Sequence, residues 1–131
     1  MLYTGIDLTE IERIKKSTEN PRFTARVFSA KEQEYFASKR NPYPSMAAAF
    51  AAKEAFSKAL GTGIRGFALN EVSVEHDPLG APFFTFTGSA AEIVRRRKPT
   101  FSLSLTHTDT VAAAFVIATE VPLPDQLNHN A

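Results

Sequence analysis

The chain has 131 residues, which is enough for one domain with a buried core and too few for two. It contains no cysteine, which excludes disulfide bonds and thiolate metal sites and is compatible with a reducing compartment. Neither a basic and apolar leader nor an apolar run long enough to cross a membrane is present, so we expect a cytoplasmic protein without a membrane partner.

One short strand and four helices are expected in the first half of the chain. Residues 2–6 form the predicted strand, and Thr9 with Glu12 forms a capping box that starts the first helix. Asp7 is therefore expected where the strand meets the helix. The second helix starts at Asn20-Pro21 and runs to Val27. The third starts with a capping box of Ser29 and Glu32 and stops before Asn41-Pro42-Tyr43-Pro44. The fourth starts at Ser45 and ends at Gly61.

The second half has the period of two that is typical of strands. Val72 and Val74 alternate with polar residues, as Phe84 and Phe86 do after a turn at residues 77–80. This pattern predicts an antiparallel hairpin.

A short helix and two more strands complete the predicted fold. Ser89 with Glu92 forms a capping box for a helix that ends at residues 95–98, whose four bases either complement the helix dipole or contact a phosphate. Strands are expected from Phe101 onward and over Val111 to Ala118. The last of these is apolar on both faces, as a central or interface strand is.

The helix predicted before Gly61 carries an acid and a base on one face. Glu54 and Lys58 are four residues apart, so they lie one above the other, on the side of Ala47 and Phe50. Taken alone, such a pair is most often a solvated ion pair that stabilises a helix by about 0.2–0.5 kcal/mol.

Three motifs place this pair in a wider pattern. They are, in chain order, Gly5-Ile6-Asp7-Leu8 followed by Arg13; Lys53-Glu54-Ala55-Phe56 followed by Lys58-Ala59-Leu60-Gly61-Thr62-Gly63; and Ser104-Leu105-Thr106-His107-Thr108 followed by Ala112-Ala113-Ala114. Together they resemble the holo-acyl-carrier-protein synthases, the small class of 4'-phosphopantetheinyl transferases. The resemblance covers about residues 2 to 118.

The resemblance implies an α+β fold of the 4'-phosphopantetheinyl transferase type, a single module with an antiparallel sheet packed with helices. We expect this domain at residues 1–119 and a polar tail at residues 120–131. The implied reaction transfers the 4'-phosphopantetheine of coenzyme A to a serine of apo acyl carrier protein and releases adenosine 3',5'-bisphosphate. A chain of one module must complete its site by association, and the resemblance implies a homotrimer with sites between subunits.

The resemblance assigns catalytic roles to Asp7, Glu54 and Lys58. Asp7 and Glu54 would hold Mg²⁺ together with oxygens of the coenzyme A diphosphate, although Asp7 alone would also fit a capping role. Lys58 would direct a cation at the diphosphate, either to offset developing charge or to protonate the departing group. The base for the serine hydroxyl is either Glu54 or a metal-bound water that Glu54 orients.

Coenzyme A is expected to contact the glycine turns and the last motif. His107 has the parity of Leu103 and Leu105, which is usual for a core histidine, but its hydroxyl-bearing neighbours can form a pocket for a phosphate. By resemblance, this motif and the glycine turn contact the nucleotide end of coenzyme A. The expected binding residues are Lys58, Gly61, Thr62, Gly63, Gly80, Pro82, Ser104, Thr106, His107 and Thr108.

The sequence departs from the family pattern at two positions. Ala49 stands where relatives commonly have Arg, and Ala81 stands where they commonly have Lys between Gly80 and Pro82. Both changes remove a cation. If those cations hold phosphates, another base, such as those at residues 95–98, must compensate, or coenzyme A binds more weakly.

Basic residues are concentrated early in the chain, although the whole chain has a net charge of only +1. From Arg13 to Arg40 there are eight (Arg13, Lys15, Lys16, Arg22, Arg26, Lys31, Lys39, Arg40) against three acids (Glu19, Glu32, Glu34). This surplus is either an ordinary solvated face or a surface for an acidic partner. We expect Arg13, Lys16, Arg22 and Arg26 to face the acyl carrier protein, and no nucleic acid, because the aromatic residues have core-like spacings.

Two other functions use the same residues. A Mg²⁺-dependent hydrolase of nucleotide diphosphates needs the same carboxylates but no carrier protein. A non-catalytic module would bind coenzyme A or an acidic protein without turnover.

Overall fold

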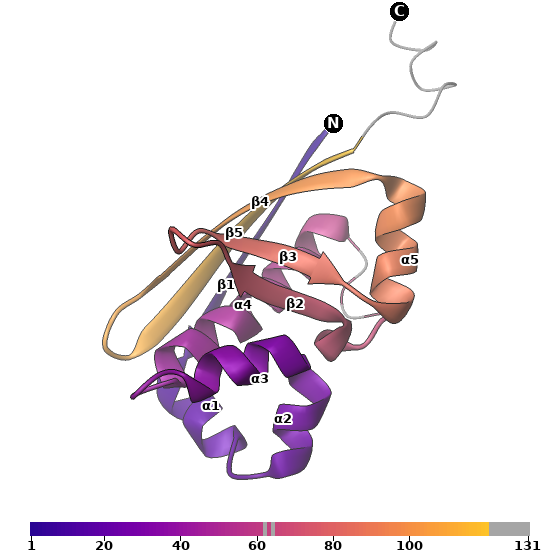
Figure 1. Cartoon of the computed structure of the whole chain (residues 1–131). Coiled ribbons are helices and arrows are strands. Elements are labelled where there is room, and N and C mark those ends of the chain that lie inside the picture. The colour runs from indigo at the N-terminus through magenta and orange to yellow at the C-terminus, as the bar shows by residue number, and fades with distance from the viewer. Residues whose placement is uncertain (62, 64, 121–131) are drawn as a thin grey trace, which may run out of the picture.

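A computed structural model describes residues 1–61, 63 and 65–120 (Figure 1). The elements in chain order are β1 (Leu2–Glu10), α1 (Ile11–Ser17), α2 (Pro21–Val27), α3 (Ala30–Ala37), α4 (Tyr43–Leu60), a short 3₁₀ helix (Leu69–Glu71), β2 (Val72–His76), β3 (Pro82–Phe86), α5 (Gly88–Arg97), β4 (Pro99–His107) and β5 (Val111–Glu120). The predicted antiparallel hairpin is confirmed as β2 and β3. Among the described residues, no helix is long and apolar enough to cross a membrane.

The main sheet has three antiparallel strands in the order β1-β5-β4, so β5 is central, as its apolar composition predicts. Its register places Asp7 opposite Ala114, and Ala114 opposite Leu105. Helix α4 packs against one face of this sheet, while α1, α2 and α3 gather at one end of the molecule (Figure 1). The functional residues of α4 are therefore positioned relative to β1 and β4 by one helix–sheet interface.

Small side chains let α4 lie close to the sheet. The buried alanines of this helix are Ala47, Ala48, Ala49, Ala51, Ala52, Ala55 and Ala59. Gly61 ends the helix in the left-handed conformation, with φ of 75°, as predicted. The start was wrong: α4 begins at Tyr43, not after Ser45, because Pro44 lies in the first turn, where proline is tolerated.

A fully buried ion pair joins α4 to α3 and to the hairpin. Lys53 Nζ lies 2.6 Å from Glu32 Oε1 and also donates to the carbonyl oxygens of Leu69 and Val72. The other oxygen of Glu32 accepts from the backbone N–H of Val74 at 2.9 Å, and Oε1 accepts from that of Ser29. Burial lowers the pKa of Lys53, and the negative charge of Glu32 opposes this shift. The lysine of the signature motif thus holds the fold together and does not face the solvent.

Two other predicted helix starts were also wrong. Strand β1 continues through Glu10 because it pairs with β5 as far as Val111, so Thr9 and Glu12 form no capping box. Asp7 therefore lies inside the strand, not at its end. Helix α5 begins at Gly88 without a side-chain cap, and the backbone N–H of Ser89 donates to Glu71 instead.

The outer face of the main sheet carries apolar side chains in contact with solvent. Leu2, Ile6 and Leu8 of β1 are 62%, 60% and 69% exposed, and Phe115 of β5 is 39% exposed. These residues alternate with the buried residues that face α4. No described helix covers this face, so the monomer leaves an apolar surface in water.

Glu120, assigned to the tail from the sequence, is the last residue of β5 and pairs with Arg97 of α5. The rest of the predicted tail, residues 121–131, lies outside the described residues.

Candidate active site

The side chain of Asp7 points from β1 toward α4 and is held from two sides. Lys58 Nζ donates to Oδ1 at 3.2 Å, and Thr9 Oγ1 donates to Oδ2 at 3.1 Å. Lys58 Nζ also donates to the carbonyl oxygen of Ile6 at 2.9 Å. These contacts fix the carboxylate of Asp7, which remains 18% exposed at the edge of the helix–sheet interface.

Glu54 lies one turn before Lys58 on α4 and is partly buried. Burial raises the pKa of Glu54, the negative charge of Asp7 raises it further, and the charges of Lys58 and Arg13 lower it. The structure therefore brings together two carboxylates, distant in sequence, that repel each other. A divalent cation between them would relieve this repulsion.

The donor set fits Mg²⁺, which takes oxygen ligands and is commonly held by one or two carboxylates, phosphates and water. Among the described residues, no group of three or more His, Asp or Glu is arranged to hold a metal ion. Asp7 and Glu54 would therefore need oxygens from the substrate and water to complete the coordination.

Gly5 sets the distance between β1 and α4. A Cβ at this position would lie 1.9 Å from the carbonyl oxygen of Ala55 and 2.9 Å from the backbone nitrogen of Ala59. Only glycine allows the strand to approach the helix backbone this closely. The absent side chain at Gly5 thus brings Asp7 within reach of Glu54 and Lys58.

Replacing Gly5 by Ala is expected to push α4 away from β1. Because the added methyl group meets backbone and not a flexible side chain, we expect a loss of about 1–3 kcal/mol of unfolding free energy, as in overpacked cores. Catalytic activity should also fall, by more than the loss of folded protein explains, because the shift of α4 increases the distance between the carboxylates of Asp7 and Glu54. Urea unfolding measures the stability and a steady-state rate measures the activity, with Thr4→Ala on the exposed side of β1 as control. Unchanged activity and stability in Gly5→Ala would contradict this prediction.

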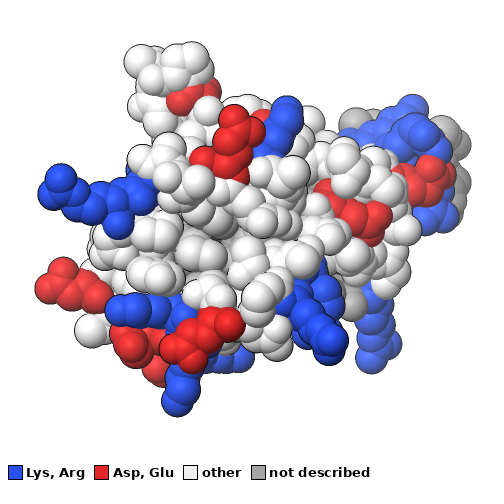
Figure 2. Space-filling view, turned by 60° about the horizontal axis from the view of Figure 1, so that its bottom comes forward, with Lys and Arg blue, Asp and Glu red and all other residues white. Residues whose placement is uncertain are grey.

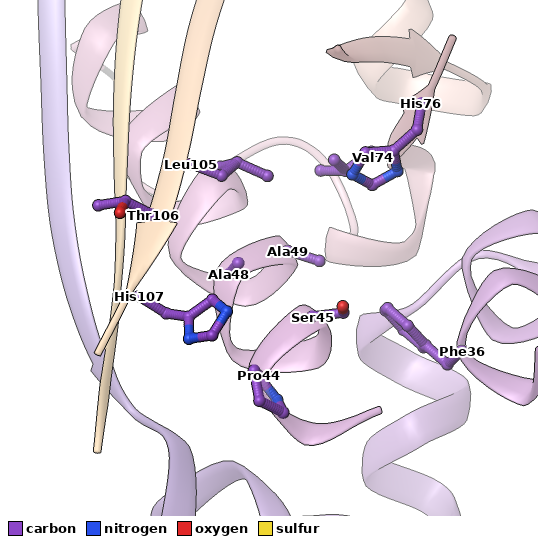
Figure 3. Close-up of a pocket in the computed structure, with 10 residues that line it drawn as sticks. All are labelled: Phe36, Pro44, Ser45, Ala48, Ala49, Val74, His76, Leu105, Thr106 and His107. Carbon is purple, nitrogen blue, oxygen red and sulfur yellow. The ribbon is translucent and has the colours of Figure 1, made fainter. Parts of the chain in front are cut away.

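His107 lies in a second group of residues, around a cavity between α4, β2 and β4. The cavity has a volume of about 120 Å³ and is lined by Phe36, Pro44, Ser45, Ala48, Ala49, Val74, His76, Leu105, Thr106 and His107. Figure 3 shows His107 at the end of β4 and His76 at the end of β2 on opposite sides of this space. Burial lowers the pKa of His76, and the positive charge of Lys39 lowers it further.

One chain does not bring these two groups together. At about 100° per residue, Glu54 and Ser45 are about 180° apart around α4. Asp7 and Glu54 therefore lie on one side of this helix, and the cavity with His107 lies on the other.

Of the hydroxyl-bearing residues expected beside His107, Thr106 lines the same cavity, whereas Ser104 and Thr108 do not. Ser104 and Thr106 are exposed on the outer face of the sheet, because they alternate with Leu105 and His107. Figure 3 shows the side chain of Thr106 directed away from the cavity. The hydroxyl of Thr108 accepts from the backbone N–H of Val111 at 3.1 Å and so stabilises the turn between β4 and β5.

The glycine turns lie at two places in the fold. Gly61 and Gly63 follow α4 and both have positive φ, while Thr62 lies outside the described residues. Gly80 has φ of 91° in the turn between β2 and β3, and Pro82 pairs with His76 next to the cavity.

The predicted carrier surface is formed by exposed bases of α1 and α2: Arg13, Lys16, Arg22 and Arg26. Figure 2 brings this end of the molecule forward and shows basic and acidic side chains mixed around an uncharged centre. Arg13 lies near enough to Glu54 to lower its pKa, so its charge also acts on the carboxylate pair. Glu32, which reduced the basic surplus in the sequence count, is buried against Lys53 and does not offset the surface charge.

Two of the four bases at residues 95–98 have side-chain partners. Arg97 donates to the carbonyl oxygen of Leu60 at 2.9 Å and pairs with Glu120, and Arg95 pairs with Glu92. Arg97 therefore joins α5 to the end of α4 and to β5, and does not simply face water.

Comparison with known proteins decides the family. A model of the 4'-phosphopantetheinyl transferase superfamily matches residues 3–117. The chain belongs to this superfamily. It is 40% identical over 119 residues to the holo-[acyl-carrier-protein] synthase of Caldanaerobacter subterraneus subsp. tengcongensis, and the match covers 89% of this chain and 94% of that protein.

Two solved holo-[acyl-carrier-protein] synthases have the same fold. The Neisseria meningitidis structure has a TM-score of 0.82 and 31% identity, covering 90% of this chain and 98% of that one. The Helicobacter pylori structure, in complex with coenzyme A, has a TM-score of 0.76 and 30% identity, covering 88% and 99%. Within its superfamily, the chain groups with the holo-[acyl-carrier-protein] synthases and is an enzyme of that kind. The single-module α+β fold expected from the sequence is confirmed.

Sequence reasoning missed three residues that the structure places around the candidate site. Thr9 was interpreted as a helix cap but holds the carboxylate of Asp7. Gly5 belongs to the first motif, but only the close approach of Ala55 explains it. His76 precedes a turn and carries no signal in the sequence that would place it opposite His107.

Proposed function

We propose that this enzyme transfers the 4'-phosphopantetheine of coenzyme A to a serine of an apo acyl carrier protein and releases adenosine 3',5'-bisphosphate. The observation that carries the proposal is the pair of Asp7 and Glu54 beside the ammonium of Lys58. A polyanionic diphosphate needs its charge offset, and this site offers ligands for a cation and one fixed positive charge. Two relatives that are holo-[acyl-carrier-protein] synthases, one of them solved in complex with coenzyme A, support these substrates.

Asp7, Glu54 and Lys58 each have a separate role in the proposed reaction. Mg²⁺ held by Asp7 and Glu54 would polarise the diphosphate. Glu54, whose pKa is raised, either takes the proton of the serine hydroxyl or orients a water that does so. The serine oxygen then bonds to the phosphorus on the pantetheine side, and the bond from that phosphorus to the bridging oxygen breaks. Lys58 offsets the charge that develops on the departing bisphosphate.

The test is to incubate the protein with coenzyme A, Mg²⁺ and an apo carrier protein, and to measure the mass of the carrier. A gain equal to one phosphopantetheine is the expected result. Cleaved nucleotide without that gain would identify a hydrolase. If neither product forms, the protein is a binding module and the proposal is contradicted.

We propose that the active enzyme is a homotrimer with its sites between subunits. Two features support this assembly. Asp7 and Glu54 lie on the opposite side of α4 from His107, so a partner subunit could bring a His107 to the carboxylates. The outer face of the main sheet, with Leu8 and Phe115, leaves an apolar surface to cover. The cytoplasmic location expected from the sequence remains a prediction.

Replacing Ala113 by Asp is expected to disperse the trimer. Ala113 lies on the outer face of β5, opposite Leu8 on one side and Thr106 on the other, so an aspartate there would bury an unpaired charge in the interface. Because Ala113 does not face α4, the monomer should still fold. Light scattering and circular dichroism measure the two effects, and Leu79→Asp, at a 96% exposed position in a turn, is the control. A trimeric and active Ala113→Asp variant would refute this interface.

Reversing Arg22 and Arg26 to Glu is expected to raise the KM for the carrier protein and to weaken its salt dependence. These residues lie on α2, and replacing them avoids Arg13, whose charge acts on Glu54. Exposed pairs contribute about 0–1 kcal/mol each, so two reversals should change KM by about tenfold at low salt and less at high salt. The KM for coenzyme A should be unchanged. The matched control is Arg96→Glu with Lys98→Glu, and a selective loss of coenzyme A binding in the α2 variant would assign this surface to the nucleotide.

A further inference from the structure

The two oxygens of the Asp7 carboxylate have partners of different kinds. Thr9 follows Asp7 by two residues on β1, so both side chains lie on the face of the strand that is turned toward α4. Thr9 is 3% exposed, and its Oγ1 donates to Oδ2 of Asp7 at 3.1 Å. The side chain of Lys58 is 55% exposed, and its Nζ donates to Oδ1 at 3.2 Å. Oδ2 is therefore held by a buried hydroxyl of the same strand, and Oδ1 by a mobile ammonium from the helix.

These two contacts differ in how easily they are released. The ammonium of Lys58 is carried by a flexible four-carbon stem in contact with water, and it also donates to the carbonyl oxygen of Ile6 at 2.9 Å. It can leave Oδ1 by a small rotation and keep a partner. Thr9 is β-branched, which restricts its first side-chain torsion, and its backbone is fixed opposite Ala112 of β5. A cation that enters beside Asp7 would therefore displace Lys58 and leave the contact with Thr9 in place.

The carboxylate of Asp7 needs such a restraint because its charge is close to that of Glu54. The negative charge of Asp7 raises the pKa of Glu54, so the two groups repel each other in the absence of a cation. The last torsion of an aspartate side chain is broad, and repulsion favours a rotation that takes the carboxylate away from Glu54. Such a rotation would break the hydrogen bond from Thr9, which therefore opposes it.

We propose that Thr9 is a positioning residue for the divalent ion: its hydroxyl holds Oδ2 of Asp7 and so presents Oδ1 to the ion when Lys58 moves away. This inference rests on the proposed function, in which Asp7 and Glu54 hold that ion. Removing a group that hydrogen-bonds to a ligating carboxylate typically lowers metal affinity by about 10–100-fold.

A second threonine provides a matched control. Thr85 of β3 donates its hydroxyl to Glu75 of β2, and Lys31 Nζ lies 3.5 Å from the other oxygen of that carboxylate. This group has the same three components as the group of Thr9, Asp7 and Lys58, but it lies on the hairpin and not at the interface of α4 with β1. Thr85→Val therefore removes the same kind of hydrogen bond without touching the proposed ion site.

The experiment titrates Mn²⁺ into the full-length protein with saturating coenzyme A and measures free Mn²⁺ by electron paramagnetic resonance, with coenzyme A alone as the blank. Thr9→Val, which keeps the shape of the side chain and loses the hydroxyl, should bind Mn²⁺ at least about tenfold more weakly than the wild type. Thr9→Ser, which keeps the hydroxyl, should stay within about threefold, and Thr85→Val should bind like the wild type. Thr9→Ala also lacks the hydroxyl and carries the same expectation if Thr9→Val does not fold in urea-free buffer.

The dependence of the rate on Mg²⁺ separates positioning from a merely structural role. In Thr9→Val the Mg²⁺ concentration at half-maximal transfer should rise about tenfold, while the maximal rate stays within about threefold. A structural role would instead lower the midpoint of urea unfolding and leave the Mg²⁺ requirement unchanged.

Three results would overturn the role of Thr9 alone. They are wild-type Mn²⁺ affinity in the variants without the hydroxyl, an equal loss of affinity in Thr9→Ser and Thr9→Val, and an equal loss in Thr85→Val and Thr9→Val. In each case a wild type that binds Mn²⁺ above the blank and adds phosphopantetheine to the carrier leaves the proposed function intact. A wild type that binds no Mn²⁺ above the blank would overturn both the role of Thr9 and the ion site at Asp7 and Glu54.

Discussion

Asp7→Asn and Glu54→Gln are each expected to lower the kcat/KM of carrier modification by about 10²–10³-fold or more. The two carboxylates act on one ion and one diphosphate, so the double variant should be little worse than the worse single one. Steady-state transfer rates at saturating Mg²⁺ measure the effect, and Glu92→Gln on α5 is a carboxylate control outside the site.

Glu54→Gln should keep or gain stability. Burial and the charge of Asp7 disfavour the ionised form of Glu54, which is why its pKa is raised. Above that pKa the charge costs stability, so a neutral glutamine should raise the melting temperature at neutral pH in the absence of divalent ions. Mg²⁺ should stabilise the wild type and not Glu54→Gln. Wild-type activity in Asp7→Asn would remove the metal hypothesis, whatever the melting temperature.

Glu32→Ala is expected to lower the free energy of unfolding by about 3–5 kcal/mol, because it leaves the ammonium of Lys53 buried without a counter-ion. It also removes the acceptor for the backbone N–H groups of Ser29 and Val74. Denaturant unfolding measures the loss, and Glu34→Ala, on the exposed side of the same helix, should change it by less than about 0.5 kcal/mol.

A double variant separates the charge from the packing at this position. Glu32→Gln with Lys53→Met removes both charges and keeps an acceptor for the backbone, so it should be more stable than Glu32→Ala. If Glu32→Ala instead costs no more than Glu34→Ala, the buried pair does not hold α3 and the hairpin to α4.

The types of most elements followed from local signals in the sequence. Proline after Asn20 and the capping box at Ser29 gave two helices, and the structure shows both caps. Alternation gave the hairpin and the two last strands. These signals depend on residues within one turn or one strand, and local hydrogen bonds are enough to satisfy them.

The errors occurred where tertiary contacts override a local pattern. Thr9 and Glu12 have the spacing of a capping box, but pairing with β5 extends β1 past Thr9. Lys53 stands next to Glu54 in the sequence, yet its partner Glu32 is 21 positions away, so its burial has no local signal. The site itself was predicted only by resemblance, because nothing in the sequence spacing of Asp7 and Glu54 connects these two residues.

The central claim, that Asp7 and Glu54 together hold one divalent ion for the coenzyme A diphosphate, is tested most directly by anomalous diffraction from crystals grown with Mn²⁺ and coenzyme A. We predict one peak per site, within about 2.0–2.2 Å of a carboxylate oxygen of Asp7 and of Glu54 and of a diphosphate oxygen. A peak that contacts the diphosphate but neither carboxylate, or bound coenzyme A with no peak between Asp7 and Glu54, would contradict the account.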